Sequence, residues 1–113
     1  MNRRAGLALG WAWVALIVYL SVMPSPPQIP VEGGDKAGHF GLYFVAALLF
    51  SILHRTSTAV LHGLGLVALG IALEFVQRWL GYRSFEIADM VADAIGVAAG
   101  FGLAQLVPVR LFR

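Results

Sequence analysis

Asp89 and Asp93 are two carboxylates placed one helical turn apart in a segment that is otherwise strongly apolar. Residues four apart share one face of a helix, and carboxylates this close repel each other unless an arginine, a metal ion or a shared proton intervenes. An ionisable side chain inside a membrane span also costs several kcal/mol unless it is paired, hydrated or neutralised. The pair therefore predicts a polar functional site, and both residues are candidate ligands of a divalent metal.

A second polar stripe combines an acid with a histidine. Asp35 and His39 are four residues apart, and Tyr43 follows one turn deeper. In this pattern His39 could act as a general acid or base with Asp35 orienting its ring, and Asp89 completes the set of candidate catalytic residues. Each residue also has a structural alternative: Asp35 as the N-cap of a helix, and His39 as a hydrogen-bonded histidine without a chemical role.

Glu74, Gln77 and Arg78 share a third helical face. Glu74 and Arg78 could form an ion pair that only stabilises the bundle, or they could belong to the same site as the other acids. Basic side chains suit the binding of phosphate or carboxylate groups, and nearby acids can orient them. The candidate ligand-binding residues are Lys36, Glu74, Gln77, Arg78, Arg83 and Asp93.

The composition places these residues in a membrane. The chain has 113 residues, of which 59% are hydrophobic and 12% charged, and its mean hydropathy is +0.80, whereas soluble domains are about one quarter charged. The absence of cysteine excludes disulfides, thiolate metal sites and a cysteine nucleophile. The basic residues are scattered at the ends of segments and form no patch, so no nucleic acid is expected as a partner.

The chain contains four apolar runs of about 20 residues each, which is the length that a helix needs to cross a bilayer core of roughly 30 Å. The first exceeds the apolar core of a typical signal peptide, and no small-residue cleavage site precedes Pro24, so it is expected to remain as an anchor. We expect an all-α membrane protein, a four-transmembrane-helix bundle with short loops. It forms a single domain over residues 1–113, with spans at residues 5–23, 36–53, 59–80 and 87–107.

Charge is distributed unequally between the two ends of this bundle. Basic residues in short loops favour the cytoplasm, and more of them lie at the end that holds the termini. We therefore expect both termini in the cytoplasm, and we expect the three polar stripes to face a shared cavity that opens to the outer side. In this orientation the cytoplasmic side carries Arg3, Arg4, Arg55, Arg110 and Arg113, and the outer side carries Lys36, Arg78, Arg83 and all six acidic residues.

Small residues recur every four positions from Ala88 to Ala104, and Gly6 and Gly10 form a shorter pair. Such patterns let membrane helices approach closely. The longer series is offset by one position from Asp89 and Asp93, so we expect the packing face of that helix to lie beside its charged face. A homo-oligomer is the alternative use of the same pattern.

The order and spacing of these motifs resemble the VanZ-like family of small bacterial membrane proteins. The resemblance covers residues 35–100. The family's last motif usually reads Asp-x-x-x-Asn, so Asp93 is a departure that places a titratable group where a neutral amide is expected. The residues that carry the resemblance are Asp35-Lys36-Ala37-Gly38-His39-Phe40 with Tyr43, Glu74-x-x-Gln77, Arg83, and Asp89-x-x-x-Asp93-x-x-Gly96-x-x-x-Gly100.

The resemblance implies a multi-pass protein of the bacterial cytoplasmic membrane with a role in the cell envelope. The family's founding member is associated with low-level resistance to teicoplanin, and no established reaction is implied. The expected partner is a membrane lipid or a lipid-linked envelope precursor.

Three classes of function are consistent with these residues. In the first, the site binds or modulates an envelope lipid or its lipid-linked precursor. In the second, it belongs to an intramembrane enzyme that acts on a phospholipid or polyprenyl-phosphate head group, with a divalent metal held by the aspartates of the last span. In the third, the acids and His39 form a proton or ion path. Binding is the leading hypothesis, and the enzyme is the alternative.

Overall fold

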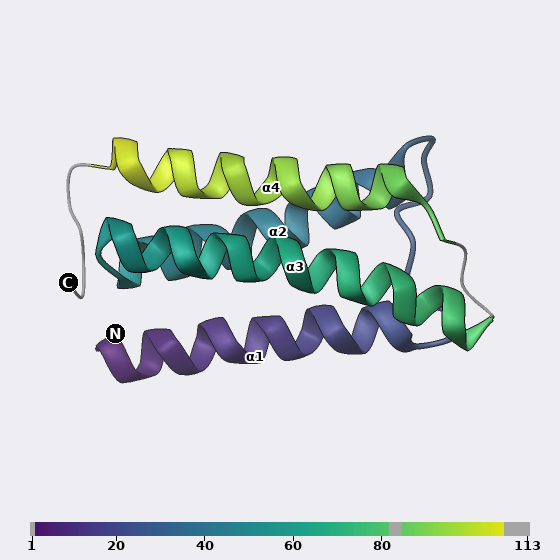
Figure 1. The fold of residues 1–113 in the computed structure, drawn as a ribbon, viewed down its shortest axis with the longest axis horizontal. Coiled ribbons are helices and arrows are strands. Elements are labelled where there is room, and N and C mark those ends of the chain that lie inside the picture. Colours follow the sequence, from purple (N-terminus) through teal and green to yellow (C-terminus); the bar gives the residue numbers. More distant parts are fainter. Residues whose placement is uncertain (1, 82–84, 108–113) are drawn as a thin grey trace.

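The computed structural model describes residues 2–81 and 85–107, and these residues form four helices joined by short loops. Each helix is long and apolar enough to cross a membrane. The predicted all-α bundle of four spans is therefore confirmed, although the first three helices begin two or three residues before the predicted boundaries. The helices are α1 Arg3–Val22, α2 Gly34–Leu53, α3 Thr56–Leu80 and α4 Ile87–Leu106 (Figure 1).

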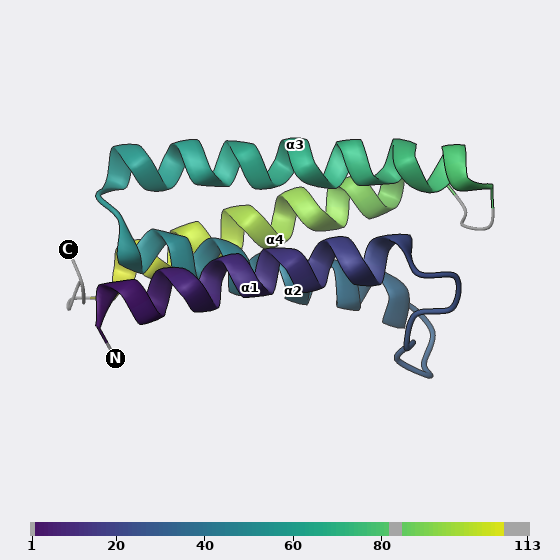
Figure 2. The same ribbon diagram turned by 90° about the horizontal axis from the view of Figure 1, so that it is seen from below.

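Successive helices run in opposite directions, so the start of α1 and the end of α4 lie at the same end of the bundle (Figures 1 and 2). Helix α2 contacts each of the other three helices, whereas α1 and α4 do not touch within the described ranges. Helices α2 and α4 both begin at the opposite end. Residues more than fifty positions apart in the chain can therefore meet there, as His39 and Asp93 do.

The interface between α2 and α4 is the most extensive in the bundle, and it depends on glycine. A Cβ atom added at Gly96 would collide with the carbonyl oxygen of Phe40, and one at Gly100 with the carbonyl oxygen of Phe44. The two backbones can approach this closely only because glycine has no side chain. The prediction that this series of small residues packs against a neighbouring helix is thus confirmed for its second half.

The buried face of α4 differs in one respect from the prediction. Ala88 is exposed and Ala92 is half-buried, whereas Asp89 and Asp93 are buried. The step from Asp93 to Gly96 is three residues, and a helix returns to the same face after either three or four residues. The charged face and the packing face of α4 are therefore one continuous face, which brings both aspartates against α2.

Exchanging Gly100 for alanine is expected to lower the free energy of unfolding by about 1–3 kcal/mol, because the added methyl group overpacks the α2–α4 contact. Gly102 lies in the same helix, and a Cβ atom there would meet no atom within 4 Å. Gly102→Ala should therefore be neutral, or stabilising by up to about 1 kcal/mol. Thermal unfolding of both variants in detergent tests the difference, and equal stability would show that this contact does not constrain the fold.

Helix α1 packs on α2 through its own glycine pair. A Cβ atom added at Gly6 would lie 2.7 Å from a methyl carbon of Leu53, and one at Gly10 would lie 3.0 Å from the ring of Phe50. The indole N–H of Trp13 also donates a 2.8 Å hydrogen bond to the carbonyl oxygen of Leu42. These contacts fix α1 on the side of α2 that faces away from α4.

The start of α2 differs from the prediction that Asp35 is its N-cap. The N-cap is Gly33, whose φ of +77° is in the left-handed region that glycine adopts without a steric penalty. The helix begins at Gly34, so Asp35 lies in the first turn and makes no capping bond. Its carboxylate is thereby available to the neighbouring side chains.

Candidate functional site

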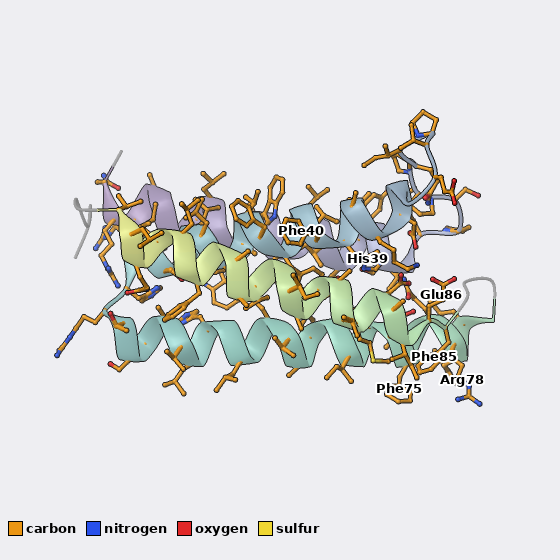
Figure 3. The ribbon with its side chains drawn as sticks, turned by 90° about the horizontal axis from the view of Figure 1, so that it is seen from above. His39, Phe40, Phe75, Arg78, Phe85 and Glu86 are labelled. Carbon is orange, nitrogen blue, oxygen red and sulfur yellow. The ribbon has the colours of Figure 1, made fainter. Side chains whose placement is uncertain are left out.

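Near the starts of α2 and α4, ionisable side chains from the two helices come together. Asp35, Lys36 and His39 come from α2, and Asp89 and Asp93 come from α4. Figure 3 shows His39 near the start of α4, where Glu86 precedes the helix. The predicted meeting of the polar stripes of these two helices is therefore seen in the structure. We refer to these residues, together with Glu74 and Glu86, as the acidic cluster.

His39 lies between carboxylates from both helices. Its Nδ1 atom is 2.8 Å from Oδ1 of Asp93, which is a hydrogen bond, and Asp93 is only 2% exposed. Its Nε2 atom lies 3.6 Å from Oδ2 of Asp89 and 3.9 Å from Oδ1 of Asp35. Asp93, and not Asp35 as predicted, therefore orients the imidazole ring. Asp35 lies one turn away on the same helix but beyond hydrogen-bonding distance, whereas Asp93 approaches from the facing helix.

Lys36 joins α2 to α4 through three carboxylates. Its ammonium group lies 2.8 Å from Oδ2 of Asp35 and 2.5 Å from Oδ1 of Asp89, and it also donates to Glu86. An ammonium group has three N–H donors, and here a carboxylate faces it from each of three residues. Lys36 is thus engaged by the carboxylates of the cluster and offsets their negative charge. The sequence had suggested that Lys36 binds a ligand.

Glu74 enters the cluster from α3 and is almost completely buried, at 1% exposure. Its Oε1 atom accepts a 2.7 Å hydrogen bond from the backbone N–H of Glu86, the residue just before α4. Glu86 makes no capping bond with its own side chain. Glu74 therefore supplies a carboxylate at the positive end of the α4 dipole, and it ties α3 to the start of α4.

Two other predicted ligand-binding residues lie apart from the cluster. Arg78 is exposed, its guanidinium carbon is 5.6 Å from the centre of the Phe85 ring, and Figure 3 shows it pointing away from His39. Gln77 is buried and donates a 2.8 Å hydrogen bond to the carbonyl oxygen of Ser21, which links α3 to α1. Arg83 lies outside the described residues.

Glu86 was absent from the residues predicted for the site, although it contacts Lys36 directly. Its position one residue before the expected span at 87–107 is a signal that could have placed it there. Side chains at a helix N-terminus lie close to the facing helix when two helices begin at the same end. The acidic cluster thus holds five of the six acidic residues of the chain, all except Glu32.

A cavity of about 120 Å³ lies beside His39, between the end of α1, the proline-containing loop and the first turns of α2. The polar residues of its lining are Ser21, Gln28, Asp35, His39 and Tyr43. The sequence predicted a cavity shared by the three polar stripes, but this cavity is lined from α1 and α2. Among the described residues, its lining includes Asp35 and His39 but no carboxylate of α4.

The other two histidines belong to a different part of the bundle. His54 and His62 stack with their ring centres 4.3 Å apart, and each ring nitrogen Nδ1 bonds a carbonyl oxygen of the preceding turn. Burial lowers the pKa of His54 below its ordinary value, which favours the neutral ring at pH 7. A larger apolar cavity of about 410 Å³ lies beside His62, and its lining includes Trp11 and Phe50.

These features define a four-span membrane protein that holds a half-buried histidine between carboxylates at one end of its bundle. The family model of VanZ/LLP1 matches residues 11–108, so the chain belongs to the VanZ/LLP1 family. An uncharacterised protein of the fission yeast Schizosaccharomyces pombe is 31% identical over 88 residues, which cover 74% of this chain and 54% of the relative. The chain thus spans about half the length of that curated relative. No solved structure matches it.

Proposed function

We propose that the acidic cluster binds the head group of a membrane lipid or of a lipid-linked envelope precursor. The observation that supports this most is the position of His39, with one nitrogen on buried Asp93 and the other facing Asp35 and Asp89 beside a cavity of about 120 Å³. Ionisable residues inside membrane spans cost free energy, and they usually mark a functional site. Lipid head groups lie at this level of a bilayer.

The role is proposed for the outer leaflet of the bacterial cytoplasmic membrane, with both termini in the cytoplasm. The arginines of the described residues at the other end of the bundle, Arg3, Arg4 and Arg55, support this orientation. Low-level resistance to teicoplanin would follow if the ligand is a lipid-linked precursor of the cell wall.

The alternative function is an enzyme acting on the phosphate ester of a phospholipid or a polyprenyl phosphate. It is supported by the 2.8 Å contact between Nδ1 of His39 and Asp93. A buried carboxylate in this position fixes the tautomer of a histidine and leaves Nε2 as a general base, as in hydrolytic triads. In this alternative a water molecule in the adjacent cavity would be the nucleophile, and His39 would remove its proton.

Replacing His39 by glutamine tests both functions. The amide can keep a hydrogen bond to Asp93 but cannot carry out proton transfer at neutral pH. We expect His39→Gln to retain at least tenfold less phospholipid than the wild type when both are purified in a mild detergent and analysed by native mass spectrometry. The matched control is His62→Gln, which removes a histidine at the other end of the bundle and should retain wild-type amounts.

Equal lipid retention by His39→Gln and the wild type would contradict the binding proposal. Incubation of the wild type with phosphatidylglycerol or undecaprenyl phosphate distinguishes the alternative, because an enzyme would release the head group or free phosphate with turnover. Expression in a teicoplanin-sensitive bacterium tests the envelope role. We expect the wild type and His62→Gln to raise the inhibitory concentration and His39→Gln to leave it unchanged.

A further inference from the structure

We propose that Asp35, His39 and Asp89 form a binding site for a divalent transition-metal cation, which shares the Asp89 carboxylate with the ammonium group of Lys36. The inference deepens the proposed function and rests on it in one respect: the cation would be the group that receives a lipid phosphate. The binding of the cation itself can be tested without any lipid.

The geometry of the three side chains suits a single ion. One ligand atom from each of Asp35, His39 and Asp89 lies within 4.8 Å of the others. Nitrogen and oxygen ligands bind zinc in a tetrahedron at about 2.0–2.2 Å, so two ligands of such an ion are about 3.4 Å apart. Small rotations of exposed Asp35 would bring the three atoms around one centre.

His39 is already oriented as a metal ligand. Metal-bound histidines usually donate their second N–H group to a carboxylate, which fixes the ring and raises the basicity of the ligating nitrogen. Here Asp93 holds Nδ1 at 2.8 Å, and Nε2 faces Asp35 and Asp89 without a hydrogen bond among the described residues. Asp93 thus has the position of an outer-shell partner, and the ligating nitrogen would be Nε2.

Asp89 presents one carboxylate oxygen to Lys36 and the other to His39. Its side chain is 6% exposed, and its Oδ1 atom accepts no hydrogen bond from the described residues. The ammonium group of Lys36 lies 2.5 Å from this oxygen as an ion pair but lacks hydrogen-bond geometry. The other oxygen of this carboxylate, Oδ2, lies 3.6 Å from Nε2 of His39, and it is the atom that an ion between the two side chains would bind.

The charge balance favours a cation over an anion at this site. Five carboxylates surround one ammonium group and one imidazole within the cluster, which leaves a net negative charge. A phosphate group would be repelled by such a site, whereas a dication reduces the repulsion and offers a position for a phosphate oxygen. Three protein ligands with one open position are typical of zinc sites that bind substrates.

The mixed nitrogen and oxygen donors indicate the class of metal. Imidazole suits zinc, copper, iron and nickel, and carboxylates also suit manganese, whereas calcium and magnesium prefer sites made of oxygen alone. Zinc and manganese are therefore the probes to use. The positive charge of Lys36 competes with the ion for Asp89, so the affinity should rise when that charge is removed.

The experiment is isothermal titration calorimetry of the 113-residue chain with Zn²⁺ and Mn²⁺, after purification without a histidine tag and treatment with a chelator. We expect one ion per chain, at least tenfold weaker binding for His39→Gln and Asp89→Asn, and tighter binding for Lys36→Met. His62→Gln and Glu32→Gln are the matched controls and should bind as the wild type does. Circular dichroism confirms that each variant is folded.

Wild-type binding by both His39→Gln and Asp89→Asn would overturn the inference, as would the absence of stoichiometric binding at micromolar concentrations. Lipid retention separates the two proposals. If the protein retains lipid but binds no ion in the titration, the cation proposal fails while the lipid proposal stands. If the ion binds but lipid retention does not depend on His39, the cation site stands and the lipid proposal fails.

Discussion

Replacing His39 by leucine is expected to lower the free energy of unfolding by about 3–5 kcal/mol, the usual cost of removing one partner of a buried charged pair. Asp93 is 2% exposed, and its Oδ1 atom is 2.8 Å from the ring nitrogen of His39. Without the imidazole this carboxylate would lose the hydrogen bond that offsets its removal from water. Equilibrium unfolding of the purified protein in detergent would measure the loss.

The double variant His39→Leu with Asp93→Leu distinguishes stability from function. Replacing both partners of a buried pair by apolar side chains is often neutral or stabilising, so the double variant should be more stable than His39→Leu alone. Lipid and metal binding should remain absent from both variants. If the double variant is less stable than His39→Leu, and its loss equals the sum of the losses of the two single variants, the His39–Asp93 contact does not stabilise the bundle.

Asp93→Asn gives a milder change at the same position. The amide oxygen can still accept a hydrogen bond from Nδ1 of His39, so the fold should be retained. Resemblance to the VanZ-like family leads us to expect asparagine at this position, and the asparagine variant therefore shows whether the extra negative charge matters. Outer-shell carboxylates of metal sites typically contribute about 10–100-fold to affinity, and we expect Zn²⁺ binding to weaken within that range.

The bundle and the general location of the site could be predicted from the sequence. Four apolar runs of about 20 residues can each cross a membrane as a helix, which makes all the backbone hydrogen bonds within the run. Residues four apart, such as Asp35 with His39 and Asp89 with Asp93, define faces on their helices. The alternating direction of successive spans then places the starts of α2 and α4 at one end of the bundle.

The details of the site depend on how each helix is rotated about its axis, and residue spacing does not determine that. The rotation of α4 is set by Gly96 and Gly100, which fit against the carbonyl oxygens of Phe40 and Phe44. This packing turns Asp93 toward His39. Arg78 is four residues from buried Glu74, yet it lies on the exposed face of α3, because the bundle covers only one part of each helix surface.

The same dependence on packing predicts a large effect at a residue that carries no chemistry. Gly70 of α3 faces the Asp93 side chain, and a Cβ atom added there would lie 2.7 Å from Oδ2 of Asp93. Asp93 is held by His39 on its other side, so Gly70→Ala should either push α3 away or turn the carboxylate from the imidazole ring. We expect a loss of about 1–3 kcal/mol in stability, and a loss of lipid and metal binding as large as that of His39→Gln.

Gly65 provides the matched control for Gly70, because it lies in the same helix and a Cβ atom added there would meet no atom within 4 Å. Gly65→Ala should bind lipid and metal as the wild type does, with stability unchanged or slightly raised. A second comparison separates positioning from folding. If Gly70→Ala acts by displacing the Asp93 carboxylate, the double variant Gly70→Ala with Asp93→Ser should be more stable than Gly70→Ala alone, because serine is smaller. It should not recover lipid or metal binding. Wild-type binding by Gly70→Ala would show that the contact between α3 and Asp93 does not position the site.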